Sequence, residues 1–170
     1  MNGGTISKSR STGGNGGAVY MYGATFIMNG GSISAEAPQG RGGAVCAYSG
    51  RFEMNGGTIT GKVPETAKYY NSARGYSGYG GAVYADYTTI NINGGTITGN
   101  TATKGNGGGI YIHFNAGTVS ISNATITGNK ASATGNTSYG HGGGIYSERG
   151  VTVENVTITG NNSNFEGGGI

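Results

Sequence analysis

Apolar and polar residues alternate over short runs that recur in a fixed order along the chain. The first run begins with Gly-Gly-Ala-Val or Gly-Gly-Gly-Ile, the second reads apolar-x-apolar-Asn or a close variant, and the third is Thr-Ile-Thr or a Ser variant. The Gly-Gly pairs of the first run begin at Gly16, Gly42, Gly80, Gly107, Gly142 and Gly167. An alternation of period two is typical of a strand with one buried face. Each repeat therefore predicts three short strands separated by turns rich in Gly and Asn.

Three short strands in every repeat of 25 to 38 residues predict an all-β fold. We expect a right-handed, single-stranded parallel β-helix, a solenoid of about six coils, because parallel strands are almost always connected right-handedly. Equivalent apolar residues of successive coils then form columns in a core that no single repeat could bury alone. The expected inward columns are Val19, Val45, Val83, Ile110 and Ile145; Phe26, Phe52, Ile90, Val119 and Val151; Met28, Met54, Ile92, Ile121 and Val153; and Ile6, Ile33, Ile59, Ile97, Ile126 and Ile158.

Composition excludes several other classes. Of 170 residues 39 are Gly, but Gly follows no three-residue period and Pro occurs only twice, so the chain is not collagen-like. No apolar run approaches the roughly 20 residues of a membrane-spanning helix, so we expect no membrane insertion by this segment. The formal net charge of +3 is too small to indicate nucleic acid as a partner. A single cysteine, Cys46, excludes an internal disulfide, and we expect neither a metal nor another cofactor.

The repeats extend over residues 1–170 as one β-helix segment, and both ends fall in mid-repeat. The opening Met-Asn-Gly-Gly matches the stretches that begin at Met28 and Met54, and the chain stops after Gly-Gly-Gly-Ile at 167–170. The largest insertions, at 61–79 and 128–141, both lie between the third run and the next Gly-Gly pair. We therefore expect them to be loops on one edge of the solenoid.

Two tetrapeptides carry a family resemblance. Gly-Gly-Ala-Val occurs at Gly16, Gly42 and Gly80, and Phe-x-x-Asn occurs at Phe26 and Phe52. This pair resembles the passenger repeats of the chlamydial polymorphic outer membrane proteins, and more broadly the GGTITGN-type repeats of autotransporter-like bacterial surface adhesins. The resemblance implies a right-handed β-helix at the bacterial cell surface or outside the cell. It also implies a non-enzymatic role, as an adhesin passenger or stalk that binds a host-cell protein or glycan.

The third run offers an alternative function. If its Ile points inward, both flanking residues point outward, in two columns about 6.6–6.8 Å apart with rows about 4.8 Å apart. Its threonines are Thr58, Thr60, Thr96, Thr98, Thr125, Thr127, Thr157 and Thr159. Such a Thr-x-Thr array resembles the ice-binding faces of insect antifreeze proteins, so ice is the alternative partner. Thr is also a good strand former on any exposed face, which explains the array without a ligand.

Aromatic and acidic residues form two further outward columns. The residues that follow the Val or Ile of the first run are predicted to form a candidate contact face of Tyr20, Tyr84, Tyr111 and Tyr146. Cys46 occupies the same column, either as a surface thiol or as a drifted position of the repeat, and not as a nucleophile. Stacked rings of this kind are good platforms for sugars or proteins. The neighbouring column reads Tyr22, Tyr48, Asp86, His113 and Glu148. The only acid and base side chains that we expect to lie close together are Asp86, His113 and Glu148. No second carboxylate flanks them within a coil, so we expect no catalytic residues.

Overall fold

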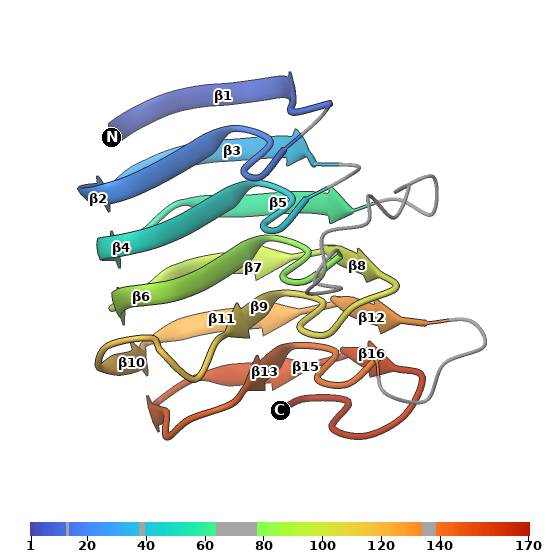
Figure 1. Ribbon diagram of the computed structural model, residues 1–170. Helices are drawn as coiled ribbons and strands as arrows, with labels where there is room; N and C mark the ends of the chain where they lie inside the picture. The colour runs from blue at the N-terminus through green and yellow to red at the C-terminus, as the bar shows by residue number, and fades with distance from the viewer. Residues whose placement is uncertain (13, 38–39, 64–77, 134–138) are drawn as a thin grey trace.

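Every regular element of the described chain is a β-strand. The computed structural model describes residues 1–12, 14–37, 40–63, 78–133 and 139–170. Its strands form two parallel sheets, stacked as the coils of a solenoid with the core between them (Figure 1). The first sheet holds β1 (Asn2–Arg10), β3 (Gly30–Glu36), β5 (Thr58–Val63), β7 (Gly95–Thr98), β8 (Thr101–Thr103), β11 (Ala124–Thr127), β12 (Lys130–Ser132), β15 (Thr157–Thr159) and β16 (Asn162–Ser163). The second holds β2 (Val19–Met28), β4 (Val45–Met54), β6 (Val83–Ile92), β9 (Ile110–Ile112), β10 (Val119–Ser122), β13 (Ile145–Ser147) and β14 (Thr152–Glu154).

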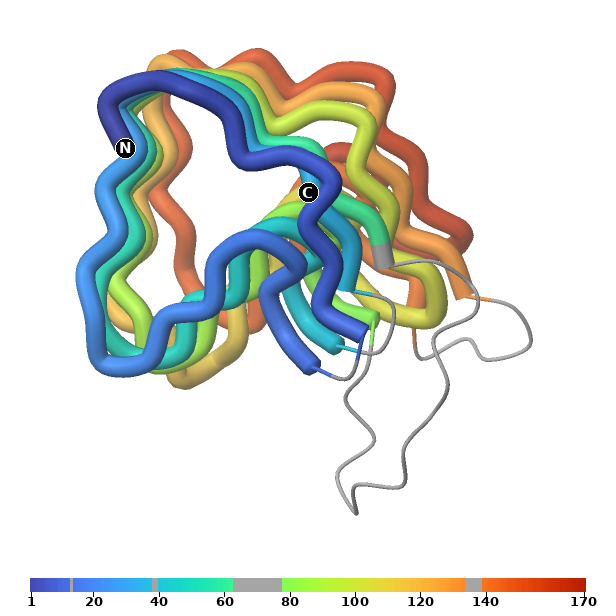
Figure 2. Tube along the Cα trace, turned by 90° about the horizontal axis from the view of Figure 1, so that it is seen from above, coloured from blue at the N-terminus to red at the C-terminus, as the bar shows by residue number. Residues whose placement is uncertain are grey.

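The coils follow one another in chain order. Seen from the N-terminal end, the chain runs clockwise as it moves away from the viewer, so the solenoid is right-handed (Figure 2). It completes about five turns, and the predicted parallel β-solenoid is confirmed. The number of turns is slightly lower than the predicted six because the sixth Gly-Gly pair, which begins at Gly167, is followed only by residues 169–170.

The division of each coil into strands differs from the three predicted. In the early coils the first and second runs join into one ten-residue strand, as in β2, β4 and β6. Each of these strands bends sharply at a residue with positive φ, and this residue has no partner in the pairing register. The three residues are Gly23, Ser49 and Tyr87, which we call the corner column. In the later coils the strand breaks at this corner into separate pieces. From the coil of β6 onward, a short extra strand (β8, β12 or β16) follows the third run.

The core contains the predicted inward columns. Phe52, Ile90, Ile97 and Ile126, among others, are fully buried between the sheets. Val153 departs from the prediction with 37% exposure, because in the described chain β14 pairs only with β10 and no strand covers its other side. A further inward column that was not predicted lies two residues after the first one: Met21, Ala47, Ala85 and Ile112.

The Gly-Gly pairs allow two backbones to approach closely at the start of each coil. A Cβ added to Gly43 would lie 2.1 Å from the carbonyl oxygen of Gly81, and one added to Gly108 would lie 2.3 Å from that of Gly143. No side chain fits at such a distance. The pairs are therefore needed for the stacking itself, which explains why they recur in every coil.

The two large insertions leave the solenoid from the same sheet. The insertion at 61–79 follows the third run in β5, and the insertion at 128–141 contains β12. Both strands belong to the first sheet, where only β8 separates them. Residues 64–77 and 134–138 of these insertions lie outside the described residues.

Candidate functional site

The predicted column of tyrosines exists, but most of it is not exposed. Strand pairing aligns Tyr20 with Cys46, Cys46 with Tyr84, Tyr84 with Tyr111, and Tyr111 with Tyr146. Tyr20 is 55% exposed, whereas Tyr84 and Tyr111 are 1% and 2% exposed, and Tyr146 is half-buried. The prediction that Tyr84 and Tyr111 belong to an exposed contact face is therefore wrong.

Further aromatic side chains cover the buried part of the column. The ring of Tyr79 stacks on that of Tyr111 at a centroid distance of 4.5 Å, and Tyr84 and Tyr146 stack on Tyr111 from the neighbouring coils, both at 5.4 Å. The guanidinium carbon of Arg41 lies 4.9 Å from the ring centre of Tyr84. Together with Cys46, the tyrosines Tyr79, Tyr84 and Tyr111 form a small second core outside the main one, against which Tyr139 and Tyr146 pack. The stacked rings therefore stabilise the solenoid.

Cys46 belongs to this second core and is not the surface thiol that the sequence predicted. It is 1% exposed. Burial raises the pKa of its thiol to about 12, because a thiolate would lose its hydration there. At neutral pH the side chain is therefore a protonated, shielded thiol with no nucleophilic role.

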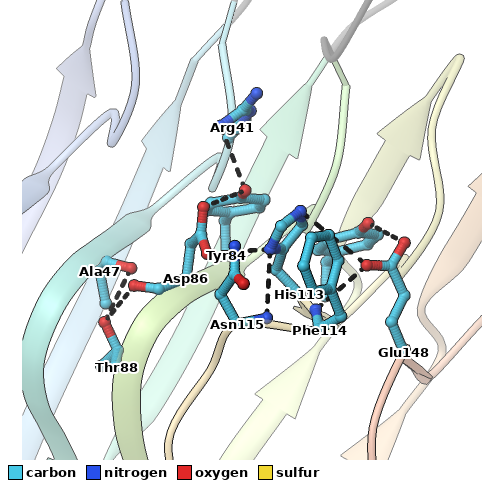
Figure 3. A network of polar contacts seen from close by, with 10 residues as sticks. Arg41, Ala47, Tyr84, Asp86, Thr88, His113, Phe114, Asn115 and Glu148 are labelled. Atoms are coloured by element: carbon cyan, nitrogen blue, oxygen red, sulfur yellow. Dashed lines mark hydrogen bonds and ion pairs between the residues drawn. The ribbon is translucent and has the colours of Figure 1, made fainter. Parts of the chain in front are cut away.

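The three acid–base groups of the neighbouring column, Asp86, His113 and Glu148, do lie together (Figure 3). Nδ1 of His113 is 2.9 Å from Oδ1 of Asp86, and Nε2 of His113 is 4.0 Å from Oε2 of Glu148. Two buried hydroxyls hold the carboxylates in place: Tyr84 donates to Asp86 at 3.3 Å, and Tyr111 donates to Glu148 at 2.6 Å. Burial raises the pKa of both tyrosines, so their hydroxyls stay protonated donors.

An open hollow of about 280 Å³ lies beside this polar row. Asp86, His113 and Arg41 contribute polar groups to its lining, and Tyr48 and Tyr87 contribute rings. The hollow thus combines charged groups with aromatic surface, a mixture that is common in sites for small polar ligands.

A turn of the next coil completes the lining of the hollow with Phe114 and Asn115. The N–H of Ala116 donates to the carbonyl of His113 at 2.8 Å, which closes the turn. The N–H of Phe114 donates to Glu148 at 3.1 Å, which ties the turn to the following coil. Glu148 therefore positions the turn, although it does not line the hollow.

Exposed aromatic rings run along the solenoid toward the hollow. The rings of Tyr22 and Tyr48 are parallel within 5° at a centroid distance of 5.6 Å, and Tyr87 follows at 5.8 Å from Tyr48. Tyr22, Tyr87 and Phe114 are 71%, 54% and 61% exposed. We call Tyr22, Tyr48, Tyr87 and Phe114 the aromatic strip.

The threonines of the third run form the expected array on the first sheet. Pairing places Thr58 beside Thr96, Thr96 beside Thr125, and Thr125 beside Thr157, and it aligns Thr98, Thr127 and Thr159 in a second column. Thr60 lies in that second column, beside Ser34. The hydroxyls of Thr127 and Thr159 are 3.3 Å apart. The threonines of the last coil are exposed and the others are half-buried, so the array is a surface feature.

Residue patterns alone did not single out Tyr87, Phe114 or Asn115. One signal for the turn was present, because the first and second runs lie 12 residues apart in this coil and 10 apart in the three coils before it. The two additional residues lengthen the connection between β9 and β10, which contains the turn at 113–118. No comparable signal marked Arg41, which approaches Tyr84 from a different coil.

Comparison with models of protein families, with curated proteins and with solved structures finds no match for this chain. Its class is therefore defined by the fold alone: a parallel β-solenoid built from degenerate repeats. None of the described residues form a helix long and apolar enough to span a membrane. Within the same ranges, no three His, Cys, Asp or Glu side chains are grouped so that they could hold a metal ion.

Proposed function

We propose that this chain is a non-enzymatic β-helix segment of a bacterial surface or secreted protein, the passenger or stalk of an adhesin. Its repeats resemble those of the polymorphic outer membrane proteins, and the proposed partner is a host-cell protein or glycan. The observation that carries the proposal is the aromatic strip, because Tyr22 and Tyr48 stack in register and Tyr87 and Phe114 present further exposed rings on the next two coils. Exposed rows of large aromatic side chains are unusual on a surface without a partner.

The rest of the solenoid supports a binding role. Parallel pairing through about five turns makes a rigid support, so rings on successive coils keep a fixed spacing. A ligand that contacts several coils at once gains affinity from each contact without further ordering of the protein. Shallow contact along a rod suits adhesion to an extended partner.

Binding of the fluorescently labelled chain to epithelial and bacterial cells, measured by flow cytometry, tests this proposal. We expect binding that falls at least tenfold in a variant carrying both Tyr22→Ser and Tyr48→Ser. The control is Phe165→Ser, which removes an exposed ring that is 41% accessible and lies outside the strip. Treating the cells with protease or with glycosidase separates a protein partner from a glycan. No binding to either cell type, or equal binding by the double variant and the control, would contradict the proposal.

Ice binding remains a second candidate, favoured by the strict register of the Thr-x-Thr array. A flat lattice of hydroxyl and methyl groups is the feature that such a function needs. Thermal hysteresis of the purified chain tests it, with Thr96→Tyr and Thr127→Tyr in the middle of the array. The control is Thr25→Tyr, an exposed threonine on the second sheet. Activity that survives both array substitutions, or no activity in the parent chain, would rule out this candidate.

A further inference from the structure

Asp86 has an unsatisfied acceptor at the wall of the hollow. Its side chain is 6% exposed, and Oδ1, although 2.9 Å from Nδ1 of His113, accepts no well-directed hydrogen bond from any described residue. Nδ1 of His113 instead lies 3.4 Å from the backbone N–H of Asn115. Nearly all buried polar atoms in folded proteins have a partner, so an exception at a hollow calls for an explanation. The carboxylate also belongs to the lining of the hollow, where it can accept from a ligand hydroxyl.

Tyr87 is held in a strained conformation at the same place. Its φ is +50°, a region that bulky side chains rarely adopt. Glycine occupies the equivalent corner in the first coil, as Gly23 with φ +63°, so the corner needs no ring to form. The buried hydroxyl of Thr88 bonds the carbonyls of Ala47 and Asp86 and fixes the backbone next to Tyr87. Strained backbone of this kind clusters at ligand sites, and among the corner residues only Tyr87 also lines the hollow.

We propose that the hollow beside Asp86 is a subsite for one neutral pyranose ring of a glycan. This inference rests on the proposed adhesive function and names the partner's chemistry. The rings of Tyr48, Tyr87 and Phe114 offer the flat apolar surface on which a sugar face packs. Asp86 and Asn115 also line the hollow, where the carboxylate accepts hydrogen bonds from sugar hydroxyls and the amide both donates and accepts them.

The size and charge of the hollow agree with this ligand. About 280 Å³ lies just below the range of roughly 300–1,000 Å³ that holds drug-sized ligands, which suits a single sugar ring. The lining holds the guanidinium of Arg41 as well as the carboxylate of Asp86, so the two opposite charges balance and give no net attraction for an acidic group. We therefore expect neutral sugars to bind more tightly than uronic acids, with the aromatic strip supporting the neighbouring sugar units.

Isothermal titration calorimetry with hexasaccharides of glucose, mannose and galactose, and with a hexagalacturonate, tests the subsite. We expect at least one neutral hexasaccharide to bind, and we expect Phe114→Ala and Asp86→Asn each to weaken its binding at least tenfold. Phe165→Ala serves as the control and should bind like the parent chain. Failure of every neutral probe, tighter binding of the hexagalacturonate, or unchanged affinity in both variants would overturn the subsite.

Tyr87→Gly separates a binding role from a structural one. Glycine relieves the positive φ, so we expect the midpoint of thermal unfolding to stay the same or rise while the affinity for the hexasaccharide falls at least tenfold. A lower midpoint with unchanged affinity would show that the ring is structural and would overturn its assignment to the subsite. Cell binding that persists without any response to sugar would refute the subsite and leave the adhesive proposal standing.

Discussion

The second glycine of the Gly-Gly pairs from Gly16 to Gly142 has no room for a side chain. At Gly108 an added Cβ would lie 2.3 Å from the carbonyl oxygen of Gly143 and 2.4 Å from the carbonyl carbon of Lys130. Both neighbours are backbone atoms and cannot move aside without breaking the stack. The side-chain pattern of the sequence therefore includes positions where the absence of a side chain is required.

We predict that Gly108→Ala lowers the free energy of unfolding by about 3 kcal/mol or more, the upper range for overpacking. Gly150→Ala is the matched control, because an added Cβ there meets nothing within 4 Å. Urea denaturation followed by circular dichroism measures both variants. Similar midpoints for the two substitutions would contradict the close approach of the coils.

The free energy of unfolding depends on pH through the buried thiol of Cys46 in the second core. Its pKa rises from an ordinary value of 9.0 to about 12 in the folded chain, so the folded state holds this proton more tightly than the unfolded state. The contribution of this group to stability is therefore complete below pH 9 and is lost as pH rises toward 12. The buried tyrosines Tyr84 and Tyr111 shift in the same direction.

We predict that the native chain resists alkylation of Cys46 by iodoacetamide at pH 8 and reacts at least a hundredfold faster in urea. Both burial and the raised pKa keep the reactive thiolate scarce. Thr25→Cys in a Cys46→Ala background provides an exposed thiol as the control. Rapid labelling of native Cys46 would show that the second core opens easily.

At the scale of elements, two ladders of asparagine side chains tie the coils together. On the surface, Asn29, Asn55 and Asn93 each donate a side-chain hydrogen bond of 2.8 Å to the coil before. Inside the corner between β11 and β12, Asn129 donates to Asn161 at 2.8 Å and to the carbonyl of Ile97 at 3.1 Å, and its Oδ1 accepts from Asn100. The buried ladder satisfies backbone groups that water cannot reach.

We predict that Asn129→Ala destabilises the chain by about 2–4 kcal/mol, because it leaves at least two buried groups unpaired. Asn93→Ala, on the exposed ladder, should cost less than about 1 kcal/mol because water replaces its partners. The difference is measured by urea denaturation of the two variants. Equal decreases in the free energy of unfolding would mean that burial does not determine how much these hydrogen bonds contribute to stability.

The sequence predicted which residues of each strand point inward better than it predicted which outward residues are exposed. Alternation fixes which residues point inward, and the repeat fixes the register, so Ile59, Ile97 and Ile126 align as predicted. Exposure of the outward residues depends on what covers them. Tyr84 and Tyr111 are covered by Arg41 and Tyr79, which come from the variable ends of insertions and carry no repeat signal. The candidate site was predicted only in part for the same reason.

At the scale of the whole molecule, the solenoid is a chain of nearest-neighbour contacts. Each coil packs only on the coils before and after it, so central coils have two partners and the outer ones have a single partner in the described chain. The outward columns give the two sheets different chemistry, with threonines on the first and the aromatic strip on the second. Stability should therefore vary along the axis.

We predict that amide hydrogen exchange is slowest in the middle of the solenoid. The tripeptide Thr-Ile-Thr occurs at 58–60, 96–98, 125–127 and 157–159, so the intrinsic exchange rates of the central residues are nearly identical and the last three copies give an internally controlled comparison. Ile97 and Ile126 are buried between two neighbouring coils, whereas Ile158 is half-buried in the last coil. Mass spectrometry of peptic peptides should show exchange at least tenfold faster at 157–159 than at 96–98, because the outer coil opens locally without unfolding the others. Equal protection at all three places would mean that the coils unfold as one cooperative unit.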